Sequence, residues 1–367
     1  MTSVNHVTPR QLTDVLATIL SAGIVPMIWS APGIGKSHIV NNDLIGRFSE
    51  IAQAIAKSRG IEIVPGTAQV WERRTGDYDL LDYAGLPYVE DGVQRRATSD
   101  IWPGVAVVTG NARDGKVWGI LFLDEFVQGG REKQTVQQRL FDEGRVGDYR
   151  LPGHHKADPN CELGLVLIVL AGNRQSDRAN SHGMGTQTGS RVAHVTLEPN
   201  VEDWIDWANA NDVDPTVVAF VRQQPEYLFK LDAQQKSEHP TGPTPRTLVH
   251  LSNLVKQCPA PEIETQLYSG VVGEECARAY IALVHAARSI DVEEVLRGNP
   301  HGADVPSEVG HQFAAASLLI RRANVDNFDN VVRYVERIGE GGFASPEIAV
   351  FVVEAIKRRT PLVAETA

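Results

Sequence analysis

Residues 30–37 read Ser-Ala-Pro-Gly-Ile-Gly-Lys-Ser, and they lie between an apolar segment, 24–29, and a segment with helical periodicity. In such a turn the glycines let backbone N–H groups close around a phosphate, and the start of a helix adds positive potential. A lysine in the first turn of a helix opposes the helix dipole, so Lys36 is poorly placed there unless an anion binds beside it. The stretch predicts a phosphate-binding loop, although alone it also fits a glycine-rich turn that merely starts a helix.

A second motif lies at residues 120–126, Ile-Leu-Phe-Leu-Asp-Glu-Phe, which read as a buried strand that ends in two adjacent carboxylates. In this setting Asp124 is expected to hold a metal ion, and Glu125 to polarise the attacking water. The segment between the two motifs is long enough for a strand crossover. Together the motifs predict a site for a nucleoside triphosphate and Mg²⁺, and they leave the choice between ATP and GTP open.

Apolar and amphipathic segments alternate along residues 1–200, and this alternation predicts an α/β fold. Helices are expected after the cap at Thr8-Pro9 and at 36–57 and 132–141, with strands at 24–29, 68–71, 120–123, 163–171 and 192–197. The almost continuous apolar run at 163–171 is typical of a strand buried on both faces. We therefore expect a P-loop domain of three αβα layers around a mainly parallel sheet.

Residues 72–102 depart from this alternation. They contain two short β-type runs, 86–89 and 93–97, around the turn Glu90-Asp91-Gly92, which predict a β-hairpin insertion. An insertion of this length in an α/β domain is more often functional than decorative. A further short strand or hairpin arm is expected at 145–151.

Beyond Pro199 the pattern changes to helices alone, which predicts a second, all-α domain. The expected helices are 201–209, 215–223, 247–255, 274–288, 312–323, 328–338 and 346–358. The chain is thus divided into a nucleotide-binding domain, 1–200, with its insertion at about 72–102, and an α-helical lid with a C-terminal helical extension, 201–367.

Three polar residues downstream of the two motifs are candidates for the same site. Asn173 follows the strand 163–171, and the carboxyl ends of parallel strands meet at the ligand crevice. Arg191 precedes the strand 192–197, where a guanidinium could neutralise charge on phosphoryl oxygens. Arg246 follows Thr244-Pro245 in a first helical turn, where a cation suggests an anionic partner. For Asn173 an ordinary turn, and for Arg191 a solvated arginine, fit the sequence equally well.

The composition limits the possible classes of protein. The chain has 367 residues, 42% hydrophobic and 22% charged, as expected of a globular protein, and a net charge of −11 disfavours a long non-specific grip on nucleic acid. No apolar run is long enough to span a membrane, and the N-terminus lacks a secretion signal. The three scattered cysteines suggest a reducing compartment, so we expect a cytoplasmic protein. His154-His155 with Cys161 is interpreted as a polar loop rather than a metal site.

The ordered motifs resemble those of the AAA+ ATPases, specifically the MoxR-like branch with an insertion in its second helix. The resemblance covers most of the first 260 residues. It is carried by the segments 31–37, 83–87 (Tyr-Ala-Gly-Leu-Pro), 121–125, 171–174 (Ala-Gly-Asn-Arg), 190–195 (Ser-Arg-Val-Ala-His-Val) and 244–246 (Thr-Pro-Arg). Two positions depart from the family pattern: Ser30 stands where the loop usually begins with glycine, and Ala84 stands where related sequences commonly have arginine.

The resemblance implies a role for each candidate residue. Lys36 would bind the β- and γ-phosphates, Ser37 and Asp124 would hold magnesium, and Glu125 would be the catalytic base. Asn173 and Arg246 would be the two sensor residues, and Arg191 the arginine finger that reaches a neighbouring subunit. The nucleotide would lie against Pro32, Gly33, Ile34, Gly35, Lys36, Ser37 and His38.

The resemblance also implies a homo-oligomeric ring, usually a hexamer, which remodels or activates a protein partner, often one with a von Willebrand A domain. Two alternatives remain open at this point. One is a nucleic-acid-stimulated NTPase of the clamp-loader, helicase or restriction type, in which Arg73-Arg74 and Arg95-Arg96 could face a pore. The other is a nucleotide-gated scaffold with little turnover, against which the pair Asp124-Glu125 argues. The identity of the partner, the ring size and the role of the C-terminal helices stay open.

Overall fold

The computed structural model describes residues 6–108, 115–174, 184–230, 241–288, 292–306, 312, 315–316, 318–319, 322–324 and 326–340. The chain divides into two compact units, Met1–Glu198 and Pro199–Ala367. No helix among the described residues is long and apolar enough to cross a membrane.

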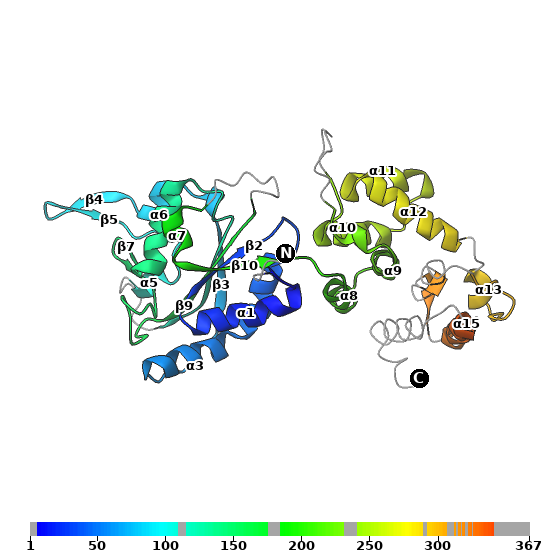
Figure 1. Ribbon diagram of the computed structural model, residues 1–367, viewed down its shortest axis with the longest axis horizontal. Helices are drawn as coiled ribbons and strands as arrows, with labels where there is room; N and C mark the ends of the chain where they lie inside the picture. The colour runs from blue at the N-terminus through cyan, green and yellow to red at the C-terminus, as the bar shows by residue number, and fades with distance from the viewer. Residues whose placement is uncertain are drawn as a thin grey trace. The chain divides into compact units, whose positions relative to one another are not determined.

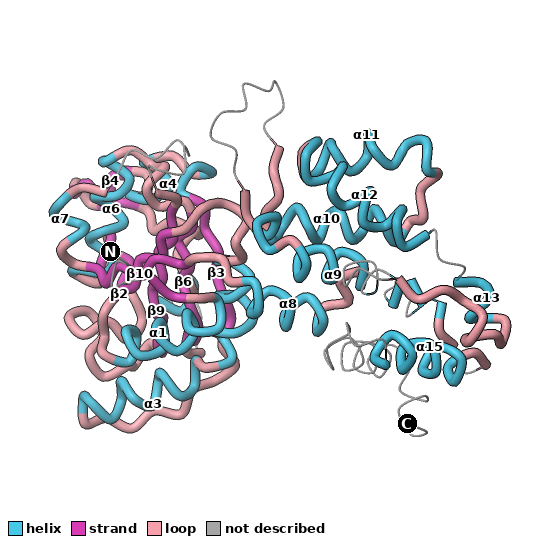
Figure 2. Tube along the Cα trace, turned by 45° about the vertical axis from the view of Figure 1, so that its right-hand side comes forward, coloured by secondary structure: helices cyan, strands magenta, loops and turns pink. Residues whose placement is uncertain are grey.

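The first unit is built around a six-stranded parallel sheet with the strand order β1-β10-β2-β9-β6-β3. The bounds of these strands are β1 His6–Val7, β2 Val25–Trp29, β3 Gln69–Arg74, β6 Val117–Asp124, β9 Gly164–Gly172 and β10 Val192–Leu197. Helices lie on both faces of the sheet (Figures 1 and 2). The predicted three-layer αβα fold with a parallel sheet is confirmed.

Two helical layers cover the sheet. Helices α1 (Pro9–Ser21) and α3 (Phe48–Arg59) pack together in one layer, with the phosphate-loop helix between them in the chain. The second layer holds α4 (Leu80–Ala84), α5 (Val105–Val108), α6 (Arg131–Asp142) and α7 (Thr186–Gly189). Because the paired strands β6 and β9 are buried along their whole length, both faces of the sheet must be apolar there.

Side-chain alternation assigns the residues of β6 and β9 to the two layers. Leu121 pairs with Ile168 and Leu123 with Leu170, and all of these residues belong to the core that includes Leu140 of α6. The intervening residues point to the opposite face because successive side chains of a strand alternate. This double burial holds the carboxyl ends of β6 and β9 firmly side by side.

The helix predicted for 36–57 is interrupted. It consists of α2 (Lys36–His38), a π-helical segment η1 (Ile39–Leu44) and α3, which begins at Phe48. The wider π turn is compatible with burial of Ile39, Val40 and Leu44, because Leu44 follows the other two by five and four positions. The prediction of one continuous helix is therefore wrong, although its start at Lys36 is right.

The hairpin predicted within the insertion is present. It consists of β4 (Pro87–Glu90) and β5 (Val93–Arg96), an antiparallel pair that extends away from the sheet (Figure 1). The insertion starts later than predicted, because β3 continues to Arg74 before the short 3₁₀ turn η2 (Thr75–Asp77). A second small hairpin, β7 (Arg145–Val146) and β8 (Tyr149–Arg150), occupies the region expected at 145–151.

The second unit consists of helices and connecting turns, with no strand among its described residues. It contains α8 (Val201–Ala210), α9 (Pro215–Gln223), a 3₁₀ turn η4 (Pro225–Leu228), α10 (Pro245–Lys256), α11 (Pro261–Val272), α12 (Glu274–Arg288), α13 (Val292–Leu296) and α15 (Phe328–Glu340). These helices share one apolar core, which includes Phe220, Leu251, Tyr280 and Tyr334. Helices α11 and α13 were not predicted from the sequence. Of the helix predicted at 312–323, residues 312, 315–316, 318–319 and 322 are described and are helical, whereas the helix predicted at 346–358 lies wholly outside the described residues.

Candidate functional site

The stretch at 30–37 forms the turn between β2 and α2. Gly33 and Gly35 have φ angles of 81° and 108°, a region that residues with a Cβ rarely adopt. A Cβ on Gly35 would meet no atom within 4 Å, so the conformation, and not crowding, requires glycine there. The loop thus presents backbone N–H groups at the start of a helix, as a phosphate site needs.

Lys36 points back into this loop and is buried, with 8% of its surface exposed. Its ammonium group donates hydrogen bonds to the Ser30 hydroxyl at 2.9 Å and to Oδ1 of Asn173 at 3.1 Å. A buried ammonium is costly unless oxygen atoms surround it. The loop and the end of β9 supply those oxygens, so Lys36 and Asn173 lie side by side at the predicted crevice edge.

Ser30 has a definite role in this arrangement. Its side chain is fully buried, and its hydroxyl donates to the carbonyl of Ala31 at 2.9 Å while it accepts from Lys36. Its backbone N–H donates to the Gly172 carbonyl at 3.2 Å, which ties the start of the loop to β9. A serine in place of glycine therefore adds an acceptor for the lysine.

The two acidic residues follow β6. The Ser37 hydroxyl lies 3.4 Å from Oδ2 of Asp124, which is 9% exposed. Glu125 has a φ angle of 54°, and its N–H donates to Oδ1 of Asp124 at 2.8 Å. The next residue, Phe126, donates its N–H to the Ala171 carbonyl at 2.9 Å, which anchors this left-handed turn to β9.

The strand order explains why residues so far apart in the chain meet. Strand β9 lies between β2 and β6, and all three run parallel, so their carboxyl ends share one edge of the sheet. This edge brings together the loop after β2, Asn173 after β9 and Asp124 after β6. It is the place at which an open α/β sheet binds its ligand.

The donor set fits a magnesium-bound polyphosphate. Mg²⁺ prefers oxygen ligands and is usually held by one or two protein groups together with phosphate oxygens. The Ser37 hydroxyl and the Asp124 carboxylate are such groups, and they are neighbours. The glycine turn and Lys36 supply the positive potential for the phosphates.

The flanking residues of the loop differ in what they can offer. The Ile34 side chain is buried, so it anchors the loop and offers a ligand only its backbone. Pro32 is exposed and has no N–H to donate. His38 is exposed too, and its carbonyl accepts a hydrogen bond from Nδ2 of Asn42 at 2.8 Å.

Arg191 lies away from this edge. It precedes β10, in which Val192 pairs with Val25 at the start of β2 and Thr196 pairs with Trp29 at its end. At about 3.3 Å per residue, Arg191 is about 16 Å along the strand from the phosphate-loop edge. Its guanidinium forms an ion pair with Asp142 at 3.0 Å, so the site of the same chain does not contain it.

Arg246 belongs to the second unit. It occupies the first turn of α10 and is exposed, with no hydrogen-bond or ion-pair partner among the described residues. The predicted cap is present, because the Thr244 hydroxyl accepts from the Thr247 N–H at 3.2 Å. A cation therefore stands in a helix N-terminal turn, where the helix dipole opposes it.

Two neighbours of the acidic pair escaped the sequence analysis. Thr75 is fully buried and its hydroxyl donates to the Asp124 carbonyl at 3.3 Å. A Cβ on Gly76 would lie 4.0 Å from Oε2 of Glu125, so Gly76 lies beside this carboxylate. Their only signal in the sequence is that they follow β3, the strand next to β6.

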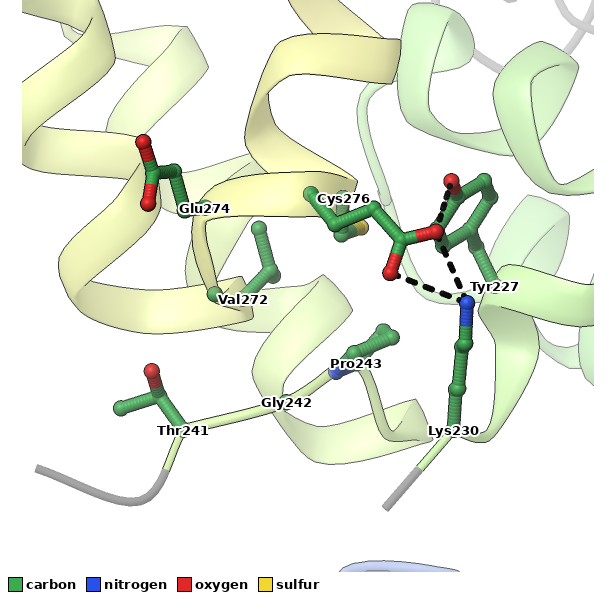
Figure 3. Close-up of a pocket in the computed structure, with 10 residues that line it drawn as sticks. Tyr227, Lys230, Thr241, Gly242, Pro243, Val272, Glu274 and Cys276 are labelled. Carbon is green, nitrogen blue, oxygen red and sulfur yellow. Dashed lines mark hydrogen bonds and ion pairs between the residues drawn. The ribbon is translucent and has the colours of Figure 1, made fainter. Parts of the chain in front are cut away.

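A separate pocket in the second unit has no comparable chemistry. Lys230 donates to both carboxylate oxygens of Glu275, at 2.8 and 3.0 Å, and the Tyr227 hydroxyl donates to the same group at 3.2 Å (Figure 3). These polar groups satisfy one another. Burial raises the pKa of the Cys276 thiol to about 12, so it stays protonated at neutral pH.

Comparisons with known proteins give only distant likenesses. No protein-family model and no curated protein matches the sequence. Among solved structures, the chain is similar to the Thermotoga maritima RuvB Holliday junction branch migration motor, with 12% identity over 90% of this chain and 87% of that one and a TM-score of 0.36. It is also similar to the Aeropyrum pernix ORC2 protein, with 13% identity over 96% and 93% and a TM-score of 0.33. NtrX from Brucella abortus gives 15% identity over 90% and 68%, with a TM-score of 0.34. The interpretation of this site therefore depends on its own geometry.

Proposed function

We propose that this protein is a P-loop ATPase of the AAA+ class. One observation carries the proposal: the glycine turn with Lys36 and Ser37, the acidic end of β6 and the amide of Asn173 meet at one edge of a parallel sheet. Ser37 lies 3.4 Å from Asp124 although 87 positions separate them in the chain. A glycine turn that merely started a helix would not require this convergence.

Each residue then has a definite task. Lys36 leaves its contacts with Ser30 and Asn173 to bind phosphate oxygens, and Asn173 is freed to orient the attacking water. Glu125, half-buried beside Gly76, accepts a proton from that water. Mg²⁺, held by Ser37 and Asp124, supplies positive charge that neutralises the phosphates when it is bound.

Steady-state ATP hydrolysis tests the proposal. We expect Lys36→Ala to abolish nucleotide binding, because the loop loses its cation, and Glu125→Gln to retain ATP while turnover falls at least 100-fold. Two exposed residues give matched controls, Lys57→Ala and Glu132→Gln, which should both behave as the unsubstituted chain does. Near-normal ATP affinity in Lys36→Ala would overturn the phosphate-loop assignment. A silent Glu125→Gln would instead favour a nucleotide-gated scaffold.

We further propose that the active form is a ring, with Arg191 as the arginine finger of the neighbouring site. Its position about 16 Å from its own phosphate loop supports action in trans, since it cannot reach that nucleotide. A hexamer of the MoxR-like type that remodels a protein partner, such as one with a von Willebrand A domain, is the finer proposal. It rests on the sequence resemblance.

Mass measurement with and without ATP tests the ring, and Arg191→Ala tests the finger. We expect an ATP-dependent assembly, and a loss of turnover of about 10³-fold in the variant without loss of ATP binding. A chain that stays monomeric with ATP, with normal turnover in Arg191→Ala, removes the trans role. The protein partner can be identified by affinity capture with the Glu125→Gln protein in the presence of ATP.

A second candidate is a nucleic-acid-stimulated ATPase, and one observation favours it. Arg145 and Arg150 are paired directly across the β7–β8 hairpin, and both are exposed without an ion pair among the described residues. Like charges at opposed positions destabilise a hairpin unless an anion lies nearby. A Cβ on Gly147 of this hairpin would lie 3.7 Å from the Cβ of Arg96, so the two hairpins lie close together at this point.

Stimulation of ATP hydrolysis by DNA or RNA, falling steeply with salt and lost in Arg145→Ala/Arg150→Ala, would establish this second candidate. Equal turnover with and without nucleic acid at low salt would remove it. Because the net charge of −11 disfavours binding to nucleic acid, we prefer the proposal of an ATPase that acts on a protein partner.

A further inference from the structure

Arg191 is held in place by two elements of its own chain. Its Nε donates to Oδ2 of Asp142 at 3.0 Å, at the end of α6. Its Nη1 donates to the carbonyl of Gln187, and its backbone N–H donates to the Thr188 carbonyl at 3.1 Å, both in α7. The position of Arg191 therefore depends on the positions of α6 and α7.

The end of α7 is in turn held by His194 of β10. The Nε2 atom of His194 lies 2.9 Å from the Gly189 carbonyl, and its Nδ1 lies 2.8 Å from Nε1 of Trp29. An indole N–H can only donate and a carbonyl can only accept. A bridge between the two groups therefore needs the proton on Nε2, with Nδ1 accepting from the indole.

Trp29 connects this bridge to the phosphate loop. It is the last residue of β2 and directly precedes Ser30, whose hydroxyl holds Lys36. The Trp29 and His194 rings are also stacked, with centroids 6.0 Å apart and planes 21° apart. The bridge thus joins the strand that carries the phosphate loop to the short helix that carries Arg191.

We propose that His194 is a positioning residue that sets the place of Arg191 relative to the phosphate-loop strand of its own chain. This inference rests on the proposed function, in which Arg191 serves the site of a neighbouring subunit. His194 is not among the residues proposed to contact the nucleotide. We therefore expect a change in it to act on the neighbour's turnover and to leave the ATP affinity of its own chain nearly unaltered.

Substitutions that keep different parts of the bridge test this. His194→Phe keeps a ring against Trp29 but loses both hydrogen bonds, and we expect turnover to fall about fivefold to tenfold, with ATP affinity within twofold of the unsubstituted chain. His194→Gln can still donate to the Gly189 carbonyl, so it should recover most of that loss. Trp29→Phe removes only the indole donor and should cost less than His194→Phe.

Mixed assemblies separate action in trans from action within one chain. His194→Phe subunits keep an intact phosphate loop, while Glu125→Gln subunits cannot hydrolyse ATP but offer a well-placed Arg191. Mixing the two should raise turnover per His194→Phe subunit at least twofold. Mixing with the double variant Glu125→Gln/Arg191→Ala should give no rise.

Each outcome decides a different statement. Three results would overturn the positioning role while the proposed ATPase stands. They are unchanged turnover in His194→Phe, a fall in its ATP affinity as large as the fall in its turnover, and no rise in turnover in the mixture with Glu125→Gln. Normal turnover in Arg191→Ala removes the finger, and the positioning role with it. Absence of ATP hydrolysis in the unsubstituted chain overturns the proposed function itself.

Discussion

At the scale of single residues, the candidate site is a set of buried polar groups that satisfy one another. Ser30 is the clearest case, since its buried hydroxyl both accepts from Lys36 and donates to the loop. The sequence revealed Lys36 and Asp124 because their chemistry is distinctive. It could not reveal the contact of Ser30 with Lys36, which depends on how the lysine folds back.

Removing that hydroxyl should therefore destabilise the empty protein. We expect Ser30→Ala to lower the free energy of unfolding by about 1–2 kcal/mol, because a buried ammonium loses one of its acceptors. Urea denaturation followed by circular dichroism measures this, with the exposed Ser49→Ala as the control. An unchanged midpoint in Ser30→Ala would show that the hydroxyl contributes nothing to the loop.

His154 makes the stability of the folded protein depend on pH. Burial, the largest influence, lowers its pKa from 6.5 to about 4, and its Nε2 lies 3.1 Å from the Phe141 carbonyl. Since the unfolded chain binds the proton more readily, stability should fall as the pH drops from about 6.5 to about 4. In His154→Gln this part of the slope should be absent. Denaturation midpoints at pH 7, 6, 5 and 4 give the comparison, and equal slopes in the two proteins contradict the assignment.

At the scale of elements, the periodicity of apolar residues predicted most strands and helices. It failed where a buried face contains polar residues. Helix α11 buries Glu264, whose Oε2 lies 3.5 Å from Nε2 of His285, so its inner face is not a continuous apolar stripe. The π-helical segment after Lys36 also has no mark in the sequence. The strand order, which brings Asp124 to the loop, follows from the paired strands themselves and not from any one of them.

The base of the β4–β5 hairpin depends on one glycine. Gly85 has a φ angle of 79°, and a Cβ on it would lie 2.0 Å from the Ala97 carbonyl. Gly85→Ala should therefore displace the hairpin and increase its cleavage in limited proteolysis, while ATP affinity stays unchanged. Gly92→Ala is the matched control, with a similar φ of 78° and no atom within 4 Å of its Cβ, and should have a smaller effect. Equal cleavage in both variants would contradict the crowding argument.

At the scale of the whole molecule, the chain consists of two units with separate cores. The proposed nucleotide contacts lie mainly in the first unit, so ATP should stabilise that unit by mass action. At about 100 times the dissociation constant we expect about 2.7 kcal/mol, seen in calorimetry as a higher unfolding temperature. Lys36→Ala should remove the shift. A shift that survives in this variant would indicate that ATP binds elsewhere.

The parallel course of β10 and β2 has a geometric consequence for assembly. If one edge of the sheet receives the nucleotide and the other offers Arg191, then two unlike surfaces must meet when subunits join. Such head-to-tail association has no two-fold axis, and it closes only when the rotation per subunit divides a full circle. The same contact with a slightly different rotation or rise per subunit would yield an open spiral. The geometry of this one contact therefore decides between a closed ring and a growing fibre.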